Sequence, residues 1–240
     1  MRLCLIPLKT EPRNPALNLQ QVRKRLNEAR AFQPDLVCLP ECALTGYLWE
    51  EKDLATFAEP IPGETVQRMA NLARSDRIHL CFGMIESAAE GFYNTALLLN
   101  PNGEILLKHR KVNEQPPYRS GAEVGSAKTE LGRIGILICG DLFHAESMAK
   151  IAPNLDLLLV PMSRGFADIS PDPQRWMNEE RQAYLVAVKK VGRTAAIVNA
   201  LENLPEEGAF GGAMVVSASG ELLAESPHGT DELLLIDLRF

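Results

Sequence analysis

Three apolar segments of this chain each end at a side chain that can take part in covalent or acid–base chemistry. The segments are 132–138 before Cys139, 35–40 before Glu41 and 104–110 before Lys111. We predict that they are strands, because open α/β sheets place their chemistry where strands end. A thiol, a carboxylate and an ammonium that met in one pocket would supply a nucleophile, its base and a cation. The pattern predicts an enzyme.

The types of these residues suggest hydrolysis through a covalent intermediate. A thiol becomes a good nucleophile when a carboxylate takes its proton and a nearby cation stabilises the thiolate. We therefore expect the Cys139 sulfur to attack an amide carbon, with Glu41 as the base. The Lys111 ammonium and the backbone N–H of Gly140 would stabilise the oxyanion. Glu41 would then protonate the departing amine and activate the water that hydrolyses the thioester, without a metal or an organic cofactor.

The sequence around all three residues resembles the nitrilase, or carbon-nitrogen hydrolase, family. The matching motifs, in chain order, are LPE at 39–41, TGY at 45–47, YNTA at 93–96, PNGE at 101–104, RK at 110–111, GRIG at 132–135 and ICGD at 138–141. Segments similar to later strands and helices of the family continue to residue 238, so the resemblance covers nearly the whole chain.

This resemblance implies a fold, an assembly and an activity. The fold would be an α/β four-layer αββα sandwich in which residues 1–240 form a single domain, and the chain would pair into a homodimer. The activity would be hydrolysis of an amide of a small metabolite by a triad of Glu41, Lys111 and Cys139. Hydrolysis of a nitrile or an N-carbamoyl compound stays open as an alternative. Another alternative is a non-catalytic relative that binds a metabolite or a protein.

Several positions depart from the family pattern and bear on the substrate. Asn113 stands where the family commonly has a histidine, and the loop after Lys111 is a few residues short. For the second glutamate of the family, which positions the substrate, Glu114 is the candidate, at the rim of the pocket, and Glu123 is a weaker one. Phe143 replaces a frequent arginine. The other predicted substrate-binding residues are Gly140, Tyr47 and His144.

The composition of the chain limits the classes of partner. With 240 residues, of which 46% are hydrophobic, the chain can bury a full core. The formal charge of −6 argues against a nucleic-acid or anionic-membrane surface, which would need clustered Lys and Arg. No apolar stretch approaches the roughly 20 residues that span a bilayer. The five cysteines contain no CxxC pair and no recognised zinc pattern, so we expect free thiols, no metal site and a cytoplasmic location.

The hydrophobic pattern alternates between the periods of strands and helices. The predicted order is strand 3–8, helix 18–31, strand 35–39, helix 64–75, strand 78–85, hairpin 93–110, strand 132–138, a short helix near 145, strand 155–161, helix 174–191 and a strand-rich end with a hairpin near 219–220. Helices between strands, together with hairpins in both halves, predict mixed sheets that are covered by helices on their outer faces.

Overall fold

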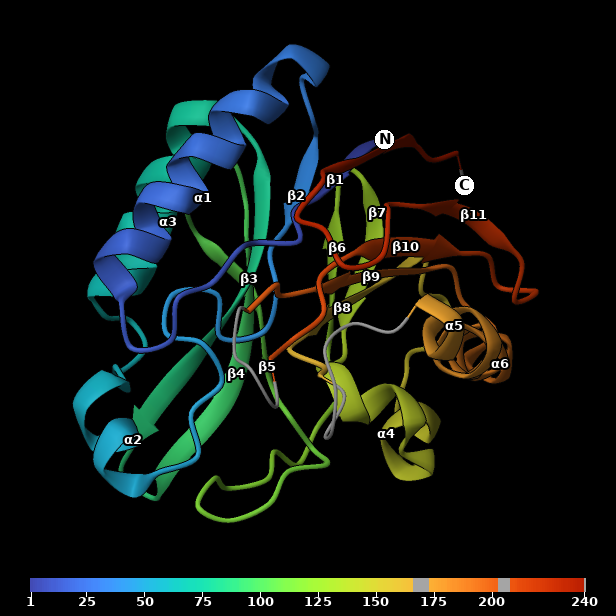
Figure 1. The fold of residues 1–240 in the computed structure, drawn as a ribbon. Coiled ribbons are helices and arrows are strands. Elements are labelled where there is room, and N and C mark those ends of the chain that lie inside the picture. The colour runs from blue at the N-terminus through green and yellow to red at the C-terminus, as the bar shows by residue number, and fades with distance from the viewer. Residues whose placement is uncertain (166–172, 203–207, 240) are drawn as a thin grey trace.

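The computed structural model describes residues 1–165, 173–202 and 208–239. In these residues two six-stranded sheets pack face to face, and helices cover the outer face of each sheet (Figure 1). The two chain ends lie together, and the amino group of Met1 donates a hydrogen bond of 2.8 Å to the Leu238 carbonyl. The layers therefore form the αββα sandwich that the family resemblance implies.

The first sheet has the strand order β12-β1-β2-β3-β4-β5. Its strands are β1 (Arg2–Leu5), β2 (Leu36–Cys38), β3 (His79–Ala88), β4 (Gly91–Leu99), β5 (Ile105–Arg110) and β12 (Leu234–Asp237). The neighbours β1, β2 and β3 are parallel, whereas β12, β4 and β5 join antiparallel at the two sides. Glu41 follows the carboxyl end of β2, and Lys111 follows β5 directly.

The second sheet has the order β11-β10-β9-β8-β7-β6. Its strands are β6 (Ser126–Thr129), β7 (Gly132–Ile136), β8 (Leu157–Met162), β9 (Ala195–Asn199), β10 (Ala213–Val216) and β11 (Leu222–Glu225). Here β7, β8 and β9 are the parallel neighbours. Because parallel strands end at the same edge of a sheet, the segments after β7 and β8 leave the sheet together. They carry Cys139 and Ser163.

Helices form the two outer layers (Figure 1). The first sheet is covered by α1 (Pro15–Ala29) and α3 (Glu64–Asp76), and α2 (Glu51–Phe57) lies beside its lower end in this view. The second sheet is covered by α4 (Ala145–Ala149) and by one helical run, which comprises α5 (Pro173–Arg175), a π-helical turn (Trp176–Glu180) and α6 (Arg181–Val191). The chain also forms 3₁₀ turns at Arg30–Phe32 and Cys139–Phe143.

Three buried apolar layers follow from the alternation of side chains along the strands. On β1, Leu3 and Leu5 pack between the two sheets, whereas Cys4 packs toward α1 and α3. On the far side, Leu158 of β8 packs in one cluster with Val188 of α6. Because both sheets are covered on both faces, their central strands are apolar along nearly their whole length.

Some elements differ from the predicted ones. The first helix begins at Pro15 rather than at residue 18, because the Asn14 side chain caps it by accepting a hydrogen bond from the Leu17 N–H. The hydrophobic pattern does not predict α2 or β6. One apolar side chain, Leu54, is buried in α2, and β6 is a four-residue edge strand of mostly polar residues. Neither element has enough apolar residues to show the hydrophobic periodicity of a helix or a strand.

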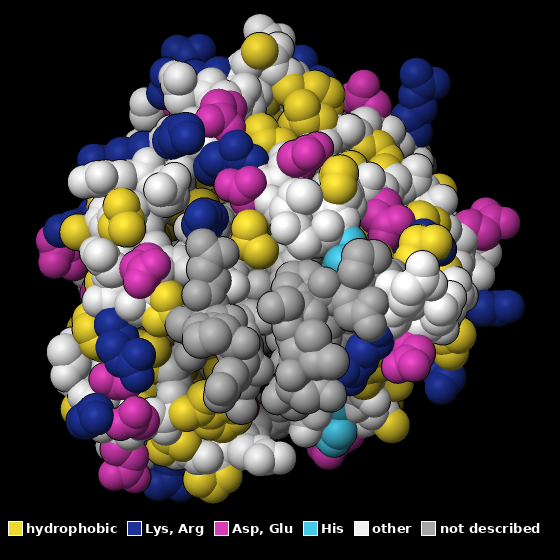
Figure 2. All heavy atoms as spheres, in the orientation of Figure 1, with side chains coloured by type: hydrophobic (Ala, Val, Ile, Leu, Met, Phe, Trp, Pro, Cys, Tyr) yellow, Lys and Arg dark blue, Asp and Glu magenta, His cyan; other side chains and the backbone are white. Residues whose placement is uncertain are grey.

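The surface carries charges of both signs. On the face shown in Figure 2, Lys and Arg side chains are interspersed with Asp and Glu, and they do not gather in one basic field. Mixed charge of this kind is typical of a solvated surface. In the part of the chain that the structure describes, no helix combines the length and the apolar character that crossing a bilayer requires.

Candidate active site

The ends of β2, β5 and β7 converge on one pocket of about 280 Å³ between the two sheets. The residues of this pocket that matter most for its chemistry are Glu41, Tyr47, Lys111, Glu114, Cys139 and Ser163. Two sheets contribute to it, because Glu41 and Lys111 follow strands of the first sheet, whereas Cys139 follows a strand of the second. The three residues are far apart in sequence, and the packing of sheet on sheet brings them together.

Glu41 is held in place by donors on both carboxylate oxygens. Its Oε1 accepts a hydrogen bond of 2.6 Å from the Asn94 amide and one of 3.1 Å from the Lys111 ammonium. Its Oε2 accepts one of 2.7 Å from the backbone N–H of Ser163, which comes from the other sheet. Only 2% of Glu41 is exposed. The carboxylate is therefore buried, oriented and linked to both halves of the fold.

Gly83 of β3 allows the turn that carries Glu41 to approach the sheet closely. A Cβ atom at position 83 would lie 2.7 Å from the Glu41 Cα and 2.5 Å from the Cys42 nitrogen, which are distances that real Cβ atoms do not show. The Gly83 backbone also bonds this turn on both sides, to the Pro40 carbonyl and to the Ala43 N–H. Only glycine at position 83 leaves room for the turn that positions Glu41. The sequence pattern alone does not reveal this role of Gly83.

Lys111 lies between two carboxylates. Its Nζ is 3.1 Å from Glu41 Oε1 and 3.2 Å from Glu114 Oε2, and the residue is 7% exposed. Burial by itself lowers the pKa of this lysine, but the carboxylates of Glu41 and Glu114 outweigh burial and raise the pKa above its usual value. Lys111 is thus an ammonium at neutral pH, and it can act as a cation but not as a base.

Glu114 lies deeper than the rim position that the sequence predicts. Its carboxylate is 3% exposed, contacts Lys111 and accepts hydrogen bonds of 2.9 Å from the Tyr47 hydroxyl and 3.1 Å from the Asn94 amide. Asn94 therefore donates a hydrogen bond to the carboxylates of both Glu41 and Glu114. In the sequence, only its place in the YNTA motif points to a role in the site. Burial and the charges of Glu41 and Glu114 raise the pKa of Tyr47, so its hydroxyl keeps its proton.

Cys139 begins a 3₁₀ turn in an unusual backbone conformation. Its φ is +46°, in the left-handed region that few residues other than glycine adopt. All five cysteines lie in the described residues; Cys139 is partly exposed, and the other four are buried. Burial, reinforced by the nearby Glu41 charge and opposed by Lys111, raises the pKa of the Cys139 thiol to about 12. At neutral pH the resting group is therefore a thiol, and its attack requires a base.

The pH dependence of alkylation tests this protonation state. The thiolate is the reactive form, so the rate of Cys139 alkylation by iodoacetamide should rise by roughly tenfold per pH unit between pH 7 and 9. Peptide mass spectrometry would measure the rate. Cys4 is the control, because burial raises its pKa to about 12 as well but its side chain is fully buried, and it should react far more slowly. A rate at Cys139 that stayed flat over this range would indicate a thiolate that is already formed.

Asp141 joins the segment of Lys111 to the segment of Cys139. Its Oδ1 accepts hydrogen bonds from the backbone N–H groups of Val112, at 3.0 Å, and Asn113, at 2.7 Å. Its Oδ2 lies 2.8 Å from His109 Nε2 and 3.3 Å from the Ile138 nitrogen, and the side chains of Asp141 and His109 are fully buried. Asp141 belongs to the ICGD motif, but its role in joining the two segments depends on contacts between the two sheets and is not visible in the motif.

An Asp141→Asn variant should be destabilised by about 2–4 kcal/mol, because its amide group would face donors and leave them without an acceptor. Urea unfolding would measure the change. Asp156→Asn is the matched control, since the exposed Asp156 carboxylate accepts one backbone hydrogen bond, from Arg133. It should cost less than about 1 kcal/mol. Equal losses in the two variants would show that Asp141 does not hold the segments together.

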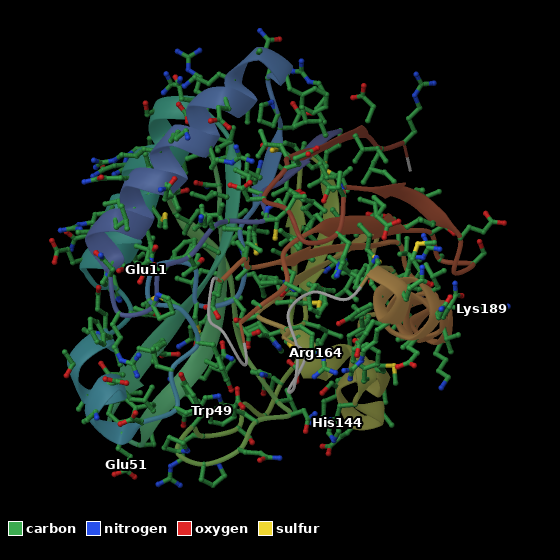
Figure 3. All side chains as sticks on the ribbon, viewed as in Figure 1. Glu11, Trp49, Glu51, His144, Arg164 and Lys189 are labelled. Atoms are coloured by element: carbon green, nitrogen blue, oxygen red, sulfur yellow. The ribbon has the colours of Figure 1, made fainter. Side chains whose placement is uncertain are left out.

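Three other predicted residues lie elsewhere around the pocket. Gly140 lines a second cavity that also reaches Cys139. The His144 ring lies 3.0 Å from the Ser147 hydroxyl at the start of α4, outside the residues that line either cavity (Figure 3). Glu123 is exposed and does not line them either. Within the described residues, no group of three or more His, Cys, Asp or Glu side chains is arranged to hold a metal ion.

Comparison with known proteins agrees with this arrangement. The model of the carbon-nitrogen hydrolase family matches residues 6–240. The chain belongs to this family. Among relatives of this carbon-nitrogen hydrolase, the omega-amidase NIT2-B of Xenopus laevis is 29% identical over 242 residues, which cover 93% of this chain and 84% of the relative.

Solved structures of the superfamily show the same fold. Nit3 of Saccharomyces cerevisiae, a nitrilase-superfamily member, superposes with a TM-score of 0.83 at 22% identity, covering 98% of this chain and 89% of Nit3. An amidase from Nesterenkonia sp. superposes with a TM-score of 0.79 at 22% identity, covering 99% of this chain and 90% of the amidase. The αββα sandwich of this carbon-nitrogen hydrolase is thus the fold of its superfamily.

Proposed function

We propose that this carbon-nitrogen hydrolase cleaves the amide bond of a small molecule through a thioester on Cys139. The observation that carries the proposal is the buried contact of Lys111 with Glu41, at 3.1 Å, in a pocket that Cys139 also lines. A structural ion pair would not need a cysteine in the wall of the same pocket. The relationship to proteins named omega-amidases supports an amide as the bond that is cleaved.

In the first half of the reaction the Cys139 sulfur attacks the amide carbon while Glu41 takes the thiol proton. A general base is needed because the thiol has a raised pKa. The Lys111 ammonium and the N–H of Gly140 stabilise the tetrahedral oxyanion. When this intermediate collapses, the carbon–nitrogen bond breaks, Glu41 returns its proton to the nitrogen, and ammonia or an amine departs. Cys139 is left as a thioester.

In the second half a water molecule attacks the thioester carbon, and Glu41 takes the proton from that water. The carbon–sulfur bond then breaks, the carboxylic acid is released, and the proton returns to the sulfur. Glu41 thus acts as base and acid in the first half of the turnover, and as base and acid again in the second, when it returns the proton to the sulfur. Glu114 holds Lys111 from the other side at 3.2 Å, which keeps the ammonium in place through both steps.

Release of ammonia tests the reaction class. The wild-type protein would be incubated with panels of carboxamides, nitriles and N-carbamoyl amino acids, and products would be measured by mass spectrometry. We expect turnover in the carboxamide panel and an acyl adduct on Cys139 in the intact protein. Turnover restricted to nitriles or N-carbamoyl compounds would overturn the amide assignment. No turnover together with an unreactive Cys139 would favour the non-catalytic alternative.

We also propose that residues 1–240 act as one domain, that the protein works in the cytoplasm, and that it forms a homodimer. The buried free thiols support a reducing compartment. The exposed apolar side chains Met177 and Val186 on the outer helical layer would suit a contact between copies. Light scattering after size-exclusion chromatography would test the dimer, and a monomer mass near the 26.4 kDa of the chain would contradict it.

A further inference from the structure

An exposed tryptophan lies at the rim of the pocket. Trp49 lines the same pocket as Glu41 and Lys111. The tryptophan is 51% exposed, whereas the two charged residues are buried. The exposed Gln115 also lines the pocket, so the pocket extends from buried charged groups to a rim with a large aromatic ring. Exposure of half of an indole to water is unfavourable, and a ligand that covers the ring removes this cost.

Neighbouring aromatic rings hold Trp49 in place. Its ring meets those of Tyr47 and Tyr118 edge to face, with centroid distances of 4.8 and 6.3 Å and interplanar angles of 87° and 77°. The Tyr118 hydroxyl donates a hydrogen bond of 2.7 Å to the Leu48 carbonyl, which fixes the backbone before Trp49. Neither tyrosine stacks on the indole. Trp49 is thus a preorganised surface, and Figure 3 shows it at the lower end of the first sheet, near Glu51.

Tyr47 links this rim to the catalytic groups. Its ring contacts Trp49, and the centroid of the same ring lies 5.1 Å from the Lys111 Nζ. The Tyr47 hydroxyl donates a hydrogen bond of 2.9 Å to Glu114, which also contacts Lys111. One side chain therefore connects Trp49 with the ammonium that stabilises the oxyanion.

The position of Glu41 indicates which part of the substrate faces Trp49. Glu41 must reach the departing nitrogen to protonate it, so the leaving group lies in the pocket that Glu41 and Trp49 both line. Cys139 also lines the second cavity, which Glu41 and Trp49 do not line, and the acyl part can extend there. A substituent on the nitrogen then leads toward the rim, where the indole lies.

The charges beside Trp49 favour a neutral ligand group. Glu50, the next residue, is paired with Lys52 at 2.6 Å and with Arg13 at 3.8 Å, so its carboxylate already has cationic partners. Gln115 contributes a neutral amide to the rim. A neutral aromatic ring suits this environment, because it buries apolar area against the indole and gains from the contact between the two rings.

We propose that Trp49 binds an aromatic group on the nitrogen side of the scissile bond, so that the substrates include secondary amides of aromatic amines. The proposal rests on the proposed amide hydrolysis and names the leaving group. Cys139 attacks the amide carbon, the carbon–nitrogen bond breaks, Glu41 gives its proton to the nitrogen, and the amine departs past Trp49. Trp49 determines specificity, and it takes no part in bond cleavage.

Three amides with the same acyl group test the proposal. N-Benzylpropanamide carries an aromatic ring on the nitrogen, N-(cyclohexylmethyl)propanamide carries a saturated ring of similar size, and propanamide carries neither. The wild-type protein should prefer the benzyl to the cyclohexylmethyl compound in kcat/KM. Trp49→Ala should lower the ratio of the benzyl compound to propanamide by roughly tenfold, the usual worth of one buried aromatic contact. Trp49→Phe should keep part of the preference, because it retains an aromatic ring.

Leu223→Ala is the matched control. Leu223 is also a large apolar side chain, 47% exposed, but it belongs to β11 and lines neither cavity. This variant should leave the ratio unchanged. An equal loss on all three substrates in Trp49→Ala would overturn the proposal, as would wild-type turnover of propanamide without turnover of the benzyl compound. A Trp49 effect confined to 3-phenylpropanamide, whose ring is on the acyl side, would also overturn it.

Direct binding separates a failure of this proposal from a failure of the proposed function. N-Benzylpropanamide would be titrated by calorimetry into Cys139→Ala with and without Trp49→Ala, a measurement that needs no turnover. Binding that weakens roughly tenfold without Trp49 supports the proposal even if no amide is hydrolysed. Binding of equal strength, or no binding to either protein, overturns it. The fluorescence change on binding should vanish in Trp49→Phe, which keeps only the buried Trp176.

Discussion

A Cys139→Ala variant is expected to lose amide hydrolysis by roughly 10⁴-fold or more in kcat, because the change removes the sulfur that forms the covalent intermediate. The fold should remain intact, since Cys139 is partly exposed and the change removes one atom from the wall of the pocket. Steady-state release of ammonia would measure the loss, and thermal unfolding would verify the fold. The acyl adduct should also disappear from the mass spectrum of the intact protein.

Cys81→Ala is the control for this experiment. Cys81 is a fully buried thiol in the core between the sheets, and it does not line the pocket. Its replacement should cost some stability but leave hydrolysis within about twofold of the wild type, because the pocket is untouched. Full hydrolysis by Cys139→Ala against every amide that the wild type cleaves would show that the nucleophile is another residue.

The second large effect is expected for Glu41→Gln, which should reduce kcat by roughly 10²- to 10⁴-fold. Glutamine has nearly the same size, but it cannot take the proton of a thiol whose pKa is raised to about 12. It also places an amide N–H₂ among the donors Asn94, Lys111 and Ser163. Single-turnover kinetics would follow formation and hydrolysis of the thioester separately, and both steps should slow.

Glu114→Gln is the comparison for Glu41→Gln. Both glutamates contact the Lys111 ammonium within 3.2 Å, and both accept a hydrogen bond from Asn94. Loss of either carboxylate should therefore weaken the hold on Lys111 to a similar extent. If Glu41 is the base, its variant should be slower than Glu114→Gln by at least about tenfold. Equal kcat values for Glu41→Gln and Glu114→Gln would contradict the assignment of Glu41 as the base.

Most strands and helices could be predicted well because they depend on local patterns, whereas the αββα layering was implied by the family resemblance. Apolar strands such as 132–138 and the alternation along β1 are properties of short stretches of sequence. Glu114 lies deeper than the predicted rim position, because Tyr47, Asn94 and Lys111 contact its carboxylate. His144 also lies outside the cavities, since its ring turns to Ser147 within the start of α4.

The sequence by itself determined the family, the order of the strands and helices other than α2 and β6, and the three residue types at the ends of β2, β5 and β7. Local spacing is sufficient for these features, because a motif and a hydrophobic period are read within a few residues. Only the tertiary structure decided which groups surround them. Asp141 bonds the Lys111 segment and Ser163 bonds Glu41 only because two sheets, built from distant parts of the chain, pack face to face. Contacts across that interface depend on side-chain packing between layers, and no local pattern records them.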